Sequence, residues 1–438
     1  MNAFRCNTTA GVLSSFLMKF IVSHPTGNRN VRAVIEGLAN HQLLAGFYTT
    51  IITKPGAPWL SFLPQKFKDE FLRRTYNVPA SLVHGHPLLE VARMVLSKLN
   101  IVSAVAHETG WASVDSVYAN LDKKVAGVLL KGVPQATHVY AYEDGALQTF
   151  EAAKKQGVTC VYDLPIAYWE VSRTLLVEEG ERLAAWAPTL GGGTADSNEK
   201  LQRKSRELEL ADIVVTPGSF VRDSIPAWAN QKKIVMSPFG SPNSTAVNMP
   251  DKKAMAKRPL RVLFAGSMSQ RKGLGDLFEA IKLLNNNNIQ LVVMGSLMAP
   301  MEFYKGQLSQ FRYETGRPNS EVLALMRTCN VFCLPSIVEG RALVMQEAMS
   351  QGLPIIITAN TGGADLVIEG ETGFLVPIRS PQSIAEKIDW CEQNREAVGE
   401  MGNKARLHAQ KYTWDNYVNL IIDTIIENVN LPRQHAAV

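Results

Sequence analysis

The chain has 438 residues, of which 46% are hydrophobic, and a formal net charge of +5 at pH 7. This length and apolar content predict two or three domains, each with a substantial core. The mild positive charge fits an anionic small molecule or a lipid surface. Without long basic runs or interleaved aromatic residues, it argues against nucleic-acid binding.

The N-terminal residues predict neither a cleaved signal nor a membrane span. Residues 11–23 are largely apolar, but Lys19 interrupts them and no small-residue cleavage site follows. The strand pattern starts only at residue 18, so we expect residues 1–17 to be a poorly ordered extension. No apolar run in the sequence is long enough to cross a bilayer.

The five cysteines are sparse and odd in number, which predicts a reducing, cytoplasmic environment. Cys329 and Cys333 flank a predicted strand, where they could be metal ligands or small apolar packing residues. Because no second pair of Cys or His accompanies them, packing is the favoured interpretation and we expect no metal site.

Strand and helix patterns alternate along the chain, which predicts parallel sheets with helices on both faces. In the first half, short apolar runs predict strands at residues 20–23, 136–139, 159–162, 213–216 and 234–236. In the second half, strands are predicted at residues 261–265, 290–294, 331–334 and 354–357, and helices at 274–284, 342–350 and 413–428.

The predicted fold class is α/β, with two Rossmann-like, doubly wound parallel-sheet domains facing a central cleft. We expect the N-terminal domain to span residues 18–245 and the C-terminal domain residues 260–412. A polar stretch rich in Pro, Asn and Lys predicts a linker at 246–259. Residues 413–438 would form a last helix and a tail.

Two segments of the first half place polar side chains near strand ends. His24, Gly27 and Asn28 follow the first strand, where Gly27 permits close backbone approach and either Asn28 or Asn30 can cap the next helix. Tyr142 and Glu143 follow the strand at 136–139 and open a helix, whose dipole an acidic group would favour. Both segments could face the cleft or be ordinary strand–helix turns.

The loop after the strand at 261–265 is a candidate phosphate site. Gly266 and Ser267 begin it, and Arg271 and Lys272 end it. A departing diphosphate gains negative charge, so a fixed cation here would bind the transition state more strongly than the ground state. The alternative is a solvated basic turn.

Glu339 and Glu347 stand eight positions apart across a predicted loop-to-helix junction. The backbone N–H groups between them would be free at the helix start and would form an anion site. These groups belong to Gly340, Arg341, Ala342 and Leu343. A carboxylate on each side of a diphosphate cradle fits a nucleotide sugar, which has ribose hydroxyls at one end and a sugar ring at the other.

These segments together resemble the family-four retaining glycosyltransferases, which have the GT-B architecture. The stretch from Glu339 to Glu347 is similar to their E-x-x-x-x-x-x-x-E signature, and matching segments occur in order from about residue 18 to residue 415. The resemblance implies that a sugar, expected to be a hexose, moves from a nucleotide-diphosphate sugar with retention of configuration by front-face attack. It implies no metal or cofactor, slightly favours a UDP-sugar, and implies that the last helix crosses back onto the first domain.

The resemblance also implies roles for individual residues. The residues expected to act in catalysis are Glu339, Lys272, Arg271 and Glu143. Those expected to bind the donor are Gly27, Asn28, Gly266, Ser267, Gly340, Arg341, Ala342, Leu343 and Glu347, the last through ribose hydroxyls. The acceptor side would comprise His24, Tyr142 and His107, although each of these histidines could equally be structural.

Two positions depart from the family pattern. Ser267 stands where the family carries an Arg, with Arg271 as the candidate replacement, and Tyr142 stands where many members carry a His. The alternative to an active enzyme is therefore a catalytically silent nucleotide-sugar-binding or scaffold protein of the same fold.

The acceptor is expected to be a glycan, a lipid-linked molecule or a small molecule, with polysaccharide biosynthesis as the setting. Residues 59–74 mix aromatics with Lys66, Lys68, Arg73 and Arg74, and this segment could lie on the inner face of an anionic membrane. The alternative is an amphipathic surface helix packed by its apolar side. We expect only weak peripheral association.

Overall fold

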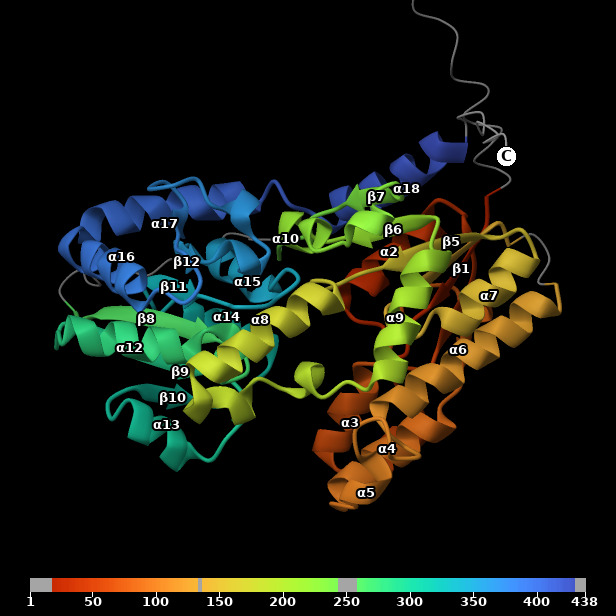
Figure 1. Ribbon diagram of the computed structural model, residues 1–438, viewed down its shortest axis with the longest axis horizontal. Coiled ribbons are helices and arrows are strands. Elements are labelled where there is room, and N and C mark those ends of the chain that lie inside the picture. Colours follow the sequence, from red (N-terminus) through yellow and green to blue (C-terminus); the bar gives the residue numbers. More distant parts are fainter. Residues whose placement is uncertain (1–17, 133–135, 243–257, 430–438) are drawn as a thin grey trace, which may run out of the picture.

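The computed structural model describes residues 18–132, 136–242 and 258–429, and the chain forms two α/β domains, each built on a fully parallel sheet (Figure 1). The predicted extension at 1–17, residues 246–257 of the predicted linker, and the tail from 430 lie outside the described residues. The predicted fold class is confirmed.

The N-terminal sheet has the strand order β3-β2-β1-β4-β5-β6-β7. Its strands are β1 (Phe20–Ser23), β2 (Leu44–Thr49), β3 (Val83–Gly85), β4 (His138–Tyr142), β5 (Thr159–Asp163), β6 (Ile213–Thr216) and β7 (Lys233–Met236). The central strands are apolar and buried on both faces, as parallel strands covered by helices on two sides must be.

The C-terminal sheet has the order β10-β9-β8-β11-β12-β13. Its strands are β8 (Leu260–Ala265), β9 (Ile289–Met294), β10 (Arg312–Glu314), β11 (Val331–Leu334), β12 (Ile355–Ile357) and β13 (Gly373–Leu375). In each sheet the order reverses beside the first strand of the domain. This switch point lies between β1 and β4 in one sheet and between β8 and β11 in the other, and ligands of such folds bind outside it.

Helices cover both faces of each sheet (Figure 1). In the N-terminal half they are α2 (Arg29–Asn40), α3 (Gln65–Leu72), α4 (Leu88–Lys98), α5 (Val102–Val105), α6 (Val114–Leu130), α7 (Leu147–Lys155), α8 (Trp169–Arg182), α9 (Asn198–Leu210) and α10 (Ser219–Asp223). In the C-terminal half they are α12 (Leu274–Leu284), α13 (Met301–Gln307), α14 (Asn319–Met326), α15 (Leu343–Ser350), α16 (Pro381–Gln393), α17 (Arg395–Ala409) and α18 (Trp414–Val429).

Each domain packs a segment from the other half of the chain into its core. Helix α18 packs against α2 and β7, and its Tyr417, Val418 and Ile421 are buried in the core of the N-terminal domain. In the opposite direction, α8 reaches towards the C-terminal domain (Figure 1), where Trp186 is buried beside Phe278. Because each domain holds an apolar segment of the other half, the two sheets stay close enough to form one cavity.

Candidate functional site

A cavity of about 530 Å³ lies between the domains, at the switch points of both sheets. Its N-terminal wall comes from the start of α2, the turn after β4 and the start of α6, and its C-terminal wall from the loop after β8 and the start of α15. The predicted site residues that line it are Asn28, Tyr142, Glu143, Lys272, Glu339, Gly340, Arg341, Ala342 and Leu343.

Glu339 forms ion pairs with both basic side chains of the predicted phosphate site. Its side chain is nearly buried, and its Oε1 accepts a hydrogen bond of 3.0 Å from Nη1 of Arg271, while its Oε2 pairs with Nζ of Lys272. Burial lowers the pKa of Lys272, and the Glu339 carboxylate opposes this shift. One carboxylate therefore neutralises two cations beside the cavity.

The cations are carried by a short turn, η6 (Gln270–Lys272), after β8. The turn ends at Gly273, which has a φ of +73°, and a Cβ at this position would lie 2.0 Å from the carbonyl oxygen of Pro335. The buried Gln270 donates from Nε2 to Glu179 and Asp276. These contacts hold the turn that presents the two cations against Pro335 and against α8 and α12.

Gly266 and Ser267 open the same loop. Gly266 has a φ of +153° and its amide donates to the carbonyl of Met294, while the Ser267 hydroxyl lies 3.4 Å from that of Ser269. Neither residue is part of the cavity lining. The family carries an Arg where this chain has Ser267, and here the guanidinium that pairs with Glu339 belongs to Arg271.

The start of α15 forms the floor of the cavity. Its N-cap, Ala342, makes no side-chain cap bond, so the helix start leaves backbone donors available. The amides of Gly340, Arg341 and Leu343 have no recorded partner among the described residues, whereas that of Ala342 donates to the carbonyl of Thr361. The prediction of free amides is therefore wrong for Ala342.

The Arg341 side chain is part of the framework. It is buried and holds Asp365 with two hydrogen bonds of 2.6 and 3.0 Å, and it also bonds Gln346. Only its backbone remains available to a ligand. Gly340 beside it has no room for a side chain, because a Cβ would lie 1.6 Å from the carbonyl oxygen of Pro165 in the N-terminal domain.

Glu347 lies on α15 and outside the cavity lining. Its Oε1 accepts a hydrogen bond of 2.8 Å from Asn319 on α14, and burial raises its pKa, which this bond opposes. Of the two carboxylates that flank the start of α15 in the sequence, Glu339 lines the cavity and Glu347 does not. Their joint contact with a nucleotide sugar stays a prediction.

The first turn of the N-terminal domain has the predicted cap. Asn28 is the N-cap of α2, and its Oδ1 accepts a hydrogen bond from the amide of Val31. Gly27 has a φ of +57°, and a Cβ there would meet the ring of Tyr76 at 2.4 Å. Asn28 faces the cavity, whereas Gly27 acts through the turn that positions Asn28.

His24 is buried and does not line the cavity. Its Nδ1 accepts hydrogen bonds from the amides of Thr26 and Gly27, at 3.1 and 2.8 Å. Burial, together with Arg74 and Arg32, lowers its pKa to about 3. The ring is therefore neutral near pH 7 and holds the turn together, and its edge packs against Tyr142.

Tyr142 ends β4, and Glu143 follows in a turn; α7 begins only at Leu147. The predicted strand thus extends further than expected, because residues 140–142 continue the buried run. Glu143 lies 3.5 Å from Nζ of Lys204. Burial raises the pKa of Glu143, and the ammonium opposes this shift. Asp163, whose carbonyl accepts from the amide of Glu143, has its pKa raised to about 7 by burial.

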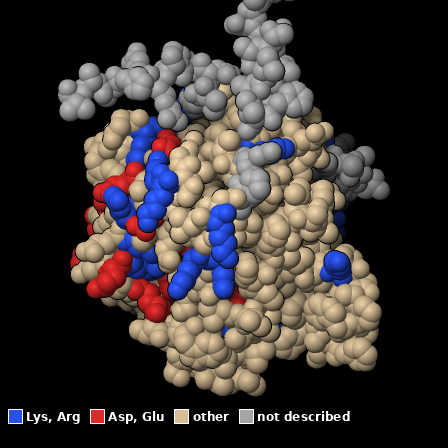
Figure 2. Space-filling model, turned by 90° about the vertical axis from the view of Figure 1, so that its right-hand side faces the viewer, with Lys and Arg blue, Asp and Glu red and all other residues tan. Residues whose placement is uncertain are grey.

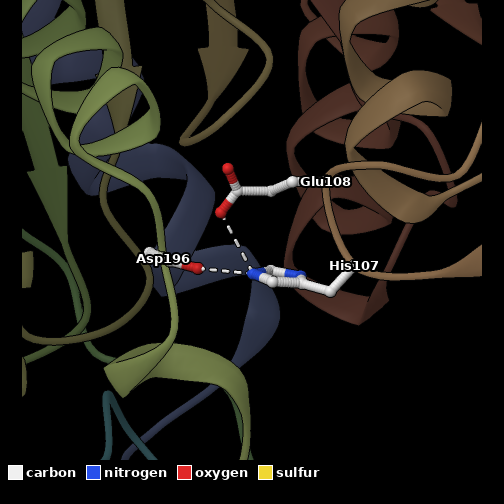
Figure 3. A group of neighbouring side chains, drawn as sticks. All are labelled: His107, Glu108 and Asp196. Atoms are coloured by element: carbon white, nitrogen blue, oxygen red, sulfur yellow. Dashed lines mark hydrogen bonds and ion pairs between the residues drawn. The ribbon is translucent and has the colours of Figure 1, made fainter.

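His107 belongs to a polar cluster outside the cavity lining (Figure 3). Its Nε2 lies 2.9 Å from Asp196 and 3.2 Å from Glu108, which together could be cation ligands. The ammonium of Lys200 lies 3.1 Å from the same Asp196 oxygen and 2.9 Å from Asp115. This ammonium already compensates the carboxylates, so the cluster joins α9 to the start of α6 as an ion-pair network. The prediction of His107 on the acceptor wall is not met by its position.

Several cavity residues were absent from the sequence predictions. They are Arg29, Asn30, Val114, Asp115, Tyr118, Asp144, Pro165, Ile166, Lys200 and Phe239. Most come from helix faces or from the turn after β5, and only the folded arrangement brings them together. Asn30 was the alternative cap for this helix, and Arg29 lies between the two cap candidates, so the predicted helix start was the local signal for both.

Residues 247–408 match the family model described as glycosyl transferases group 1. Among curated relatives, an uncharacterized glycosyltransferase of Methanocaldococcus jannaschii is 30% identical over 158 residues, covering 36% of this chain and 45% of that protein. The capsular polysaccharide biosynthesis glycosyltransferase CapM of Staphylococcus aureus is 29% identical over 197 residues, covering 40% and 51%. The chain spans about half the length of these relatives.

Solved structures share the whole fold. Sucrose-phosphate synthase from Thermosynechococcus elongatus aligns with a TM-score of 0.65 at 16% identity, covering 94% of this chain and 99% of that one. Anabaena HepE in complex with UDP aligns with a TM-score of 0.60 at 15% identity, covering 94% and 100%. The predicted glycosyltransferase resemblance is thus confirmed for the C-terminal domain, and the GT-B fold for the chain.

Proposed function

We propose that this protein transfers a sugar, expected to be a hexose, from a nucleoside-diphosphate sugar to an acceptor held by the N-terminal wall of the cavity. The observation that carries the proposal is the meeting of Lys272, Arg271 and Glu339 with the uncapped start of α15 in one interdomain cavity. Cations and free amides at a helix start form a site for a diphosphate. The family match over the same segment supports this assignment.

Within this proposal the donor displaces Glu339 from its two cations. Lys272, Arg271 and the amides of Gly340 and Leu343 then hold the diphosphate, and Glu339 turns to the sugar. The acceptor oxygen bonds to the anomeric carbon as the bond between that carbon and the phosphate oxygen of the donor breaks. The acceptor proton passes to that phosphate oxygen on the same face, so configuration is retained and no His base is used.

The nucleoside end would lie towards Glu347, whose carboxylate would accept hydrogen bonds from ribose hydroxyls. UDP is the favoured nucleotide, because the solved HepE complexes contain UDP and UDP-glucose and share this fold. Glu143 and Tyr142 lie on the opposite wall, where the acceptor would approach. A cytoplasmic location follows from the sparse cysteines, and capsular polysaccharide synthesis by a relative supports a glycan acceptor.

Membrane contact through residues 59–74 is a weaker part of the proposal. Arg74 is buried and pairs with Glu90 at 3.3 Å, so it cannot serve a lipid headgroup, whereas Arg73 is exposed. The side chain of Lys66 lies outside the described part of the chain. Among the described residues, no helix combines the length and apolar character needed to cross a bilayer.

The test is diphosphate release from a panel of UDP-, GDP- and ADP-sugars, with and without acceptor extracts. An active enzyme slowly hydrolyses one donor and does so faster with acceptor. If a donor binds by calorimetry but is never turned over, the protein is the catalytically silent binding protein that Ser267 and Tyr142 make conceivable. If no donor binds, the proposed function is wrong.

A further inference from the structure

The turn η6, which carries the two cations of the cavity, is held by a segment from the other half of the chain. This segment is residues 175–189, the second half of α8 and the turn η3 (Ala184–Thr189), and we call it the crossing segment. It lies against the C-terminal domain (Figure 1). Its Trp186 is buried there among three aromatic rings, whose centres lie 5.0 to 5.8 Å from its own, those of Phe278, Phe303 and Tyr304. The crossing segment is therefore part of the core of the domain that presents the cations.

Gln270, the first residue of η6, is bound by the crossing segment through both its backbone and its side chain. Its amide donates a hydrogen bond of 3.0 Å to Oγ1 of Thr189, and its Nε2 donates one of 2.6 Å to Oε1 of Glu179. The same Nε2 donates to Asp276 on α12, and its Oε1 accepts from the amide of Gly275. Because the two cations directly follow Gln270 in the chain, these contacts position the backbone that carries them.

Glu179 supplies the charge that holds Gln270. It is fully buried, and its Oε2 accepts hydrogen bonds from Arg182 on the same helix and from Arg379, which follows β13. Burial would raise the pKa of Glu179, but the hydrogen bonds from Arg182 and Gln270 outweigh it and lower the pKa, so the group is ionised near pH 7. Asp276 also pairs with Arg182. Two carboxylates and two guanidinium groups thus surround the amide of Gln270 as a neutral set.

This network differs from the charges on the outer face of the N-terminal domain. On that face, Lys and Arg side chains lie beside Asp and Glu side chains at the surface (Figure 2), and exposed ion pairs contribute little to stability. Glu179 and Asp276 are instead withdrawn from water, so the loss of one partner leaves a buried charge or donor unsatisfied. A buried polar network in which every group is paired favours one arrangement of the elements it joins.

The start of α8 is anchored in the N-terminal domain. Tyr168, at the N-cap, is buried in the core of that domain, and its amide donates to Oγ of Ser224. The ring N–H of Trp169 donates to Ser205 on α9. One helix thus joins the domain of the N-terminal cavity wall to the turn that carries the cations, and the position of these cations depends on both domains.

We propose that Glu179 is a positioning residue for the donor, which acts through Gln270 to hold Lys272 and Arg271 where the diphosphate binds. This inference rests on the proposed function. Glu179 does not line the cavity, so it would contact no substrate and would act only through the turn. Since a displacement of about 1 Å in a group that positions the reacting atoms can cost about 10²-fold in rate, the loss of this contact should lower turnover with every cavity residue unchanged.

The test variant is Glu179→Gln, which keeps the shape of the side chain and removes its charge. The matched control is Glu178→Gln. Glu178 is the neighbouring residue of α8 and pairs with the same Arg379 at 2.9 Å, but it is half exposed and is not a partner of Gln270. Gln270→Met is the second variant, because it removes the hydrogen bonds from the other side and leaves each carboxylate its guanidinium partner.

Calorimetric titration with UDP and diphosphate release from the donor measure the effect. Glu179→Gln and Gln270→Met should each weaken UDP binding and lower kcat/KM for the donor by about tenfold or more. Glu178→Gln should bind and react like the wild type. Combining Glu179→Gln with Lys272→Ala then separates positioning from a general loss of structure. If Glu179 acts through the turn, its substitution should change UDP affinity far less once Lys272 is absent.

Wild-type UDP affinity in both Glu179→Gln and Gln270→Met overturns the proposal, and so does a loss that adds in full to that of Lys272→Ala. Should Glu179→Gln fail to fold, Gln270→Met is judged by the same two criteria. If the wild type binds no UDP and hydrolyses no donor, the proposed function is wrong and the role of Glu179 falls with it. If the wild type is active and the variants match it, only the role of Glu179 is refuted.

Discussion

Replacing Glu339 by Gln separates donor binding from turnover. In the ligand-free protein this carboxylate holds Arg271 at 3.0 Å and also pairs with Lys272. At an effective dielectric constant of about 20, the direct attraction at 3.0 Å is about 5 kcal/mol, most of which desolvation cancels. In the proposed function a diphosphate displaces this carboxylate, so the substitution would remove a competitor for both cations.

We therefore expect the Glu339→Gln variant to bind UDP as tightly as the wild type, or up to about tenfold more tightly. Transfer and donor hydrolysis should fall by about 10²- to 10³-fold, because the group facing the reacting sugar is lost. Calorimetric titration with UDP measures the first quantity, and diphosphate release the second.

The matched control is Glu90→Gln. Glu90 is also buried and also pairs with two cations, in its case the guanidinium groups of Arg74 and Arg93, but it does not line the cavity. Both variants should lose about 1–3 kcal/mol of stability, since each leaves a cation without its partner. Only Glu339→Gln should lose turnover. If its UDP affinity falls as much as its rate, Glu339 organises the site and does not act on the sugar.

Three further predictions concern other parts of the account. Lys272→Ala should lower turnover by about 10²- to 10³-fold, and Lys272→Arg should restore part of it; equal rates for all three proteins would exclude a diphosphate contact. Gly340→Ala should reduce turnover, because the added Cβ would lie 1.6 Å from the carbonyl oxygen of Pro165 in the other domain. Gly306→Ala is the control and should keep the wild-type rate, because its added Cβ has no atom within 4 Å. A normal rate for Gly340→Ala would show that turnover does not need the two domains this close together. Burial raises the pKa of Asp163 to about 7 from its usual 3.8. The folded protein therefore holds this proton more tightly than the unfolded chain, and the stability that the protonated group contributes is fully present below pH about 4. That stability is lost, by up to about 4 kcal/mol, as the pH rises through about 7. Denaturant unfolding of Asp163→Asn across this range should show a flatter pH dependence than the wild type, and an unchanged slope would contradict the raised pKa.

Short apolar runs were sufficient to predict the central strands of both sheets. The predictions missed β2, β3, β10 and β13. Three of these are edge strands of three residues, and Arg312–Glu314 and Val83–Gly85 carry partly exposed or charged side chains. An edge strand is paired on one side only and needs no continuous apolar sequence, so its pairing partner and not its composition defines it.

In the candidate site, too, contacts with residues distant in the sequence could not be predicted. The spacing of Glu339 and Glu347 and the basic turn at Lys272 are local patterns, and the structure brings Lys272 and Glu339 together in one cavity. The engagement of the Ala342 amide by Thr361, and of the Arg341 side chain by Asp365, depends on residues about twenty positions away along the chain. Such partners are decided by tertiary packing, which no pattern within the motif contains.

The N-terminal wall of the cavity was the least predictable part of the site. Asp115 and Lys200 reach the cavity from two helices that are distant in sequence, and their 2.9 Å ion pair forms only in the folded domain. His107 was a reasonable candidate by residue type, yet Asp196 holds it outside the cavity lining.

The central claim is that a nucleoside diphosphate binds where the turn at Lys272 meets the start of α15. A crystal structure of the protein soaked with UDP tests it most directly. The account predicts phosphate oxygens within hydrogen-bond distance of Lys272 Nζ and of the Gly340 and Leu343 amides, with ribose hydroxyls at Glu347. Phosphates bound elsewhere, with Glu339 still paired to Lys272 and Arg271, would contradict it.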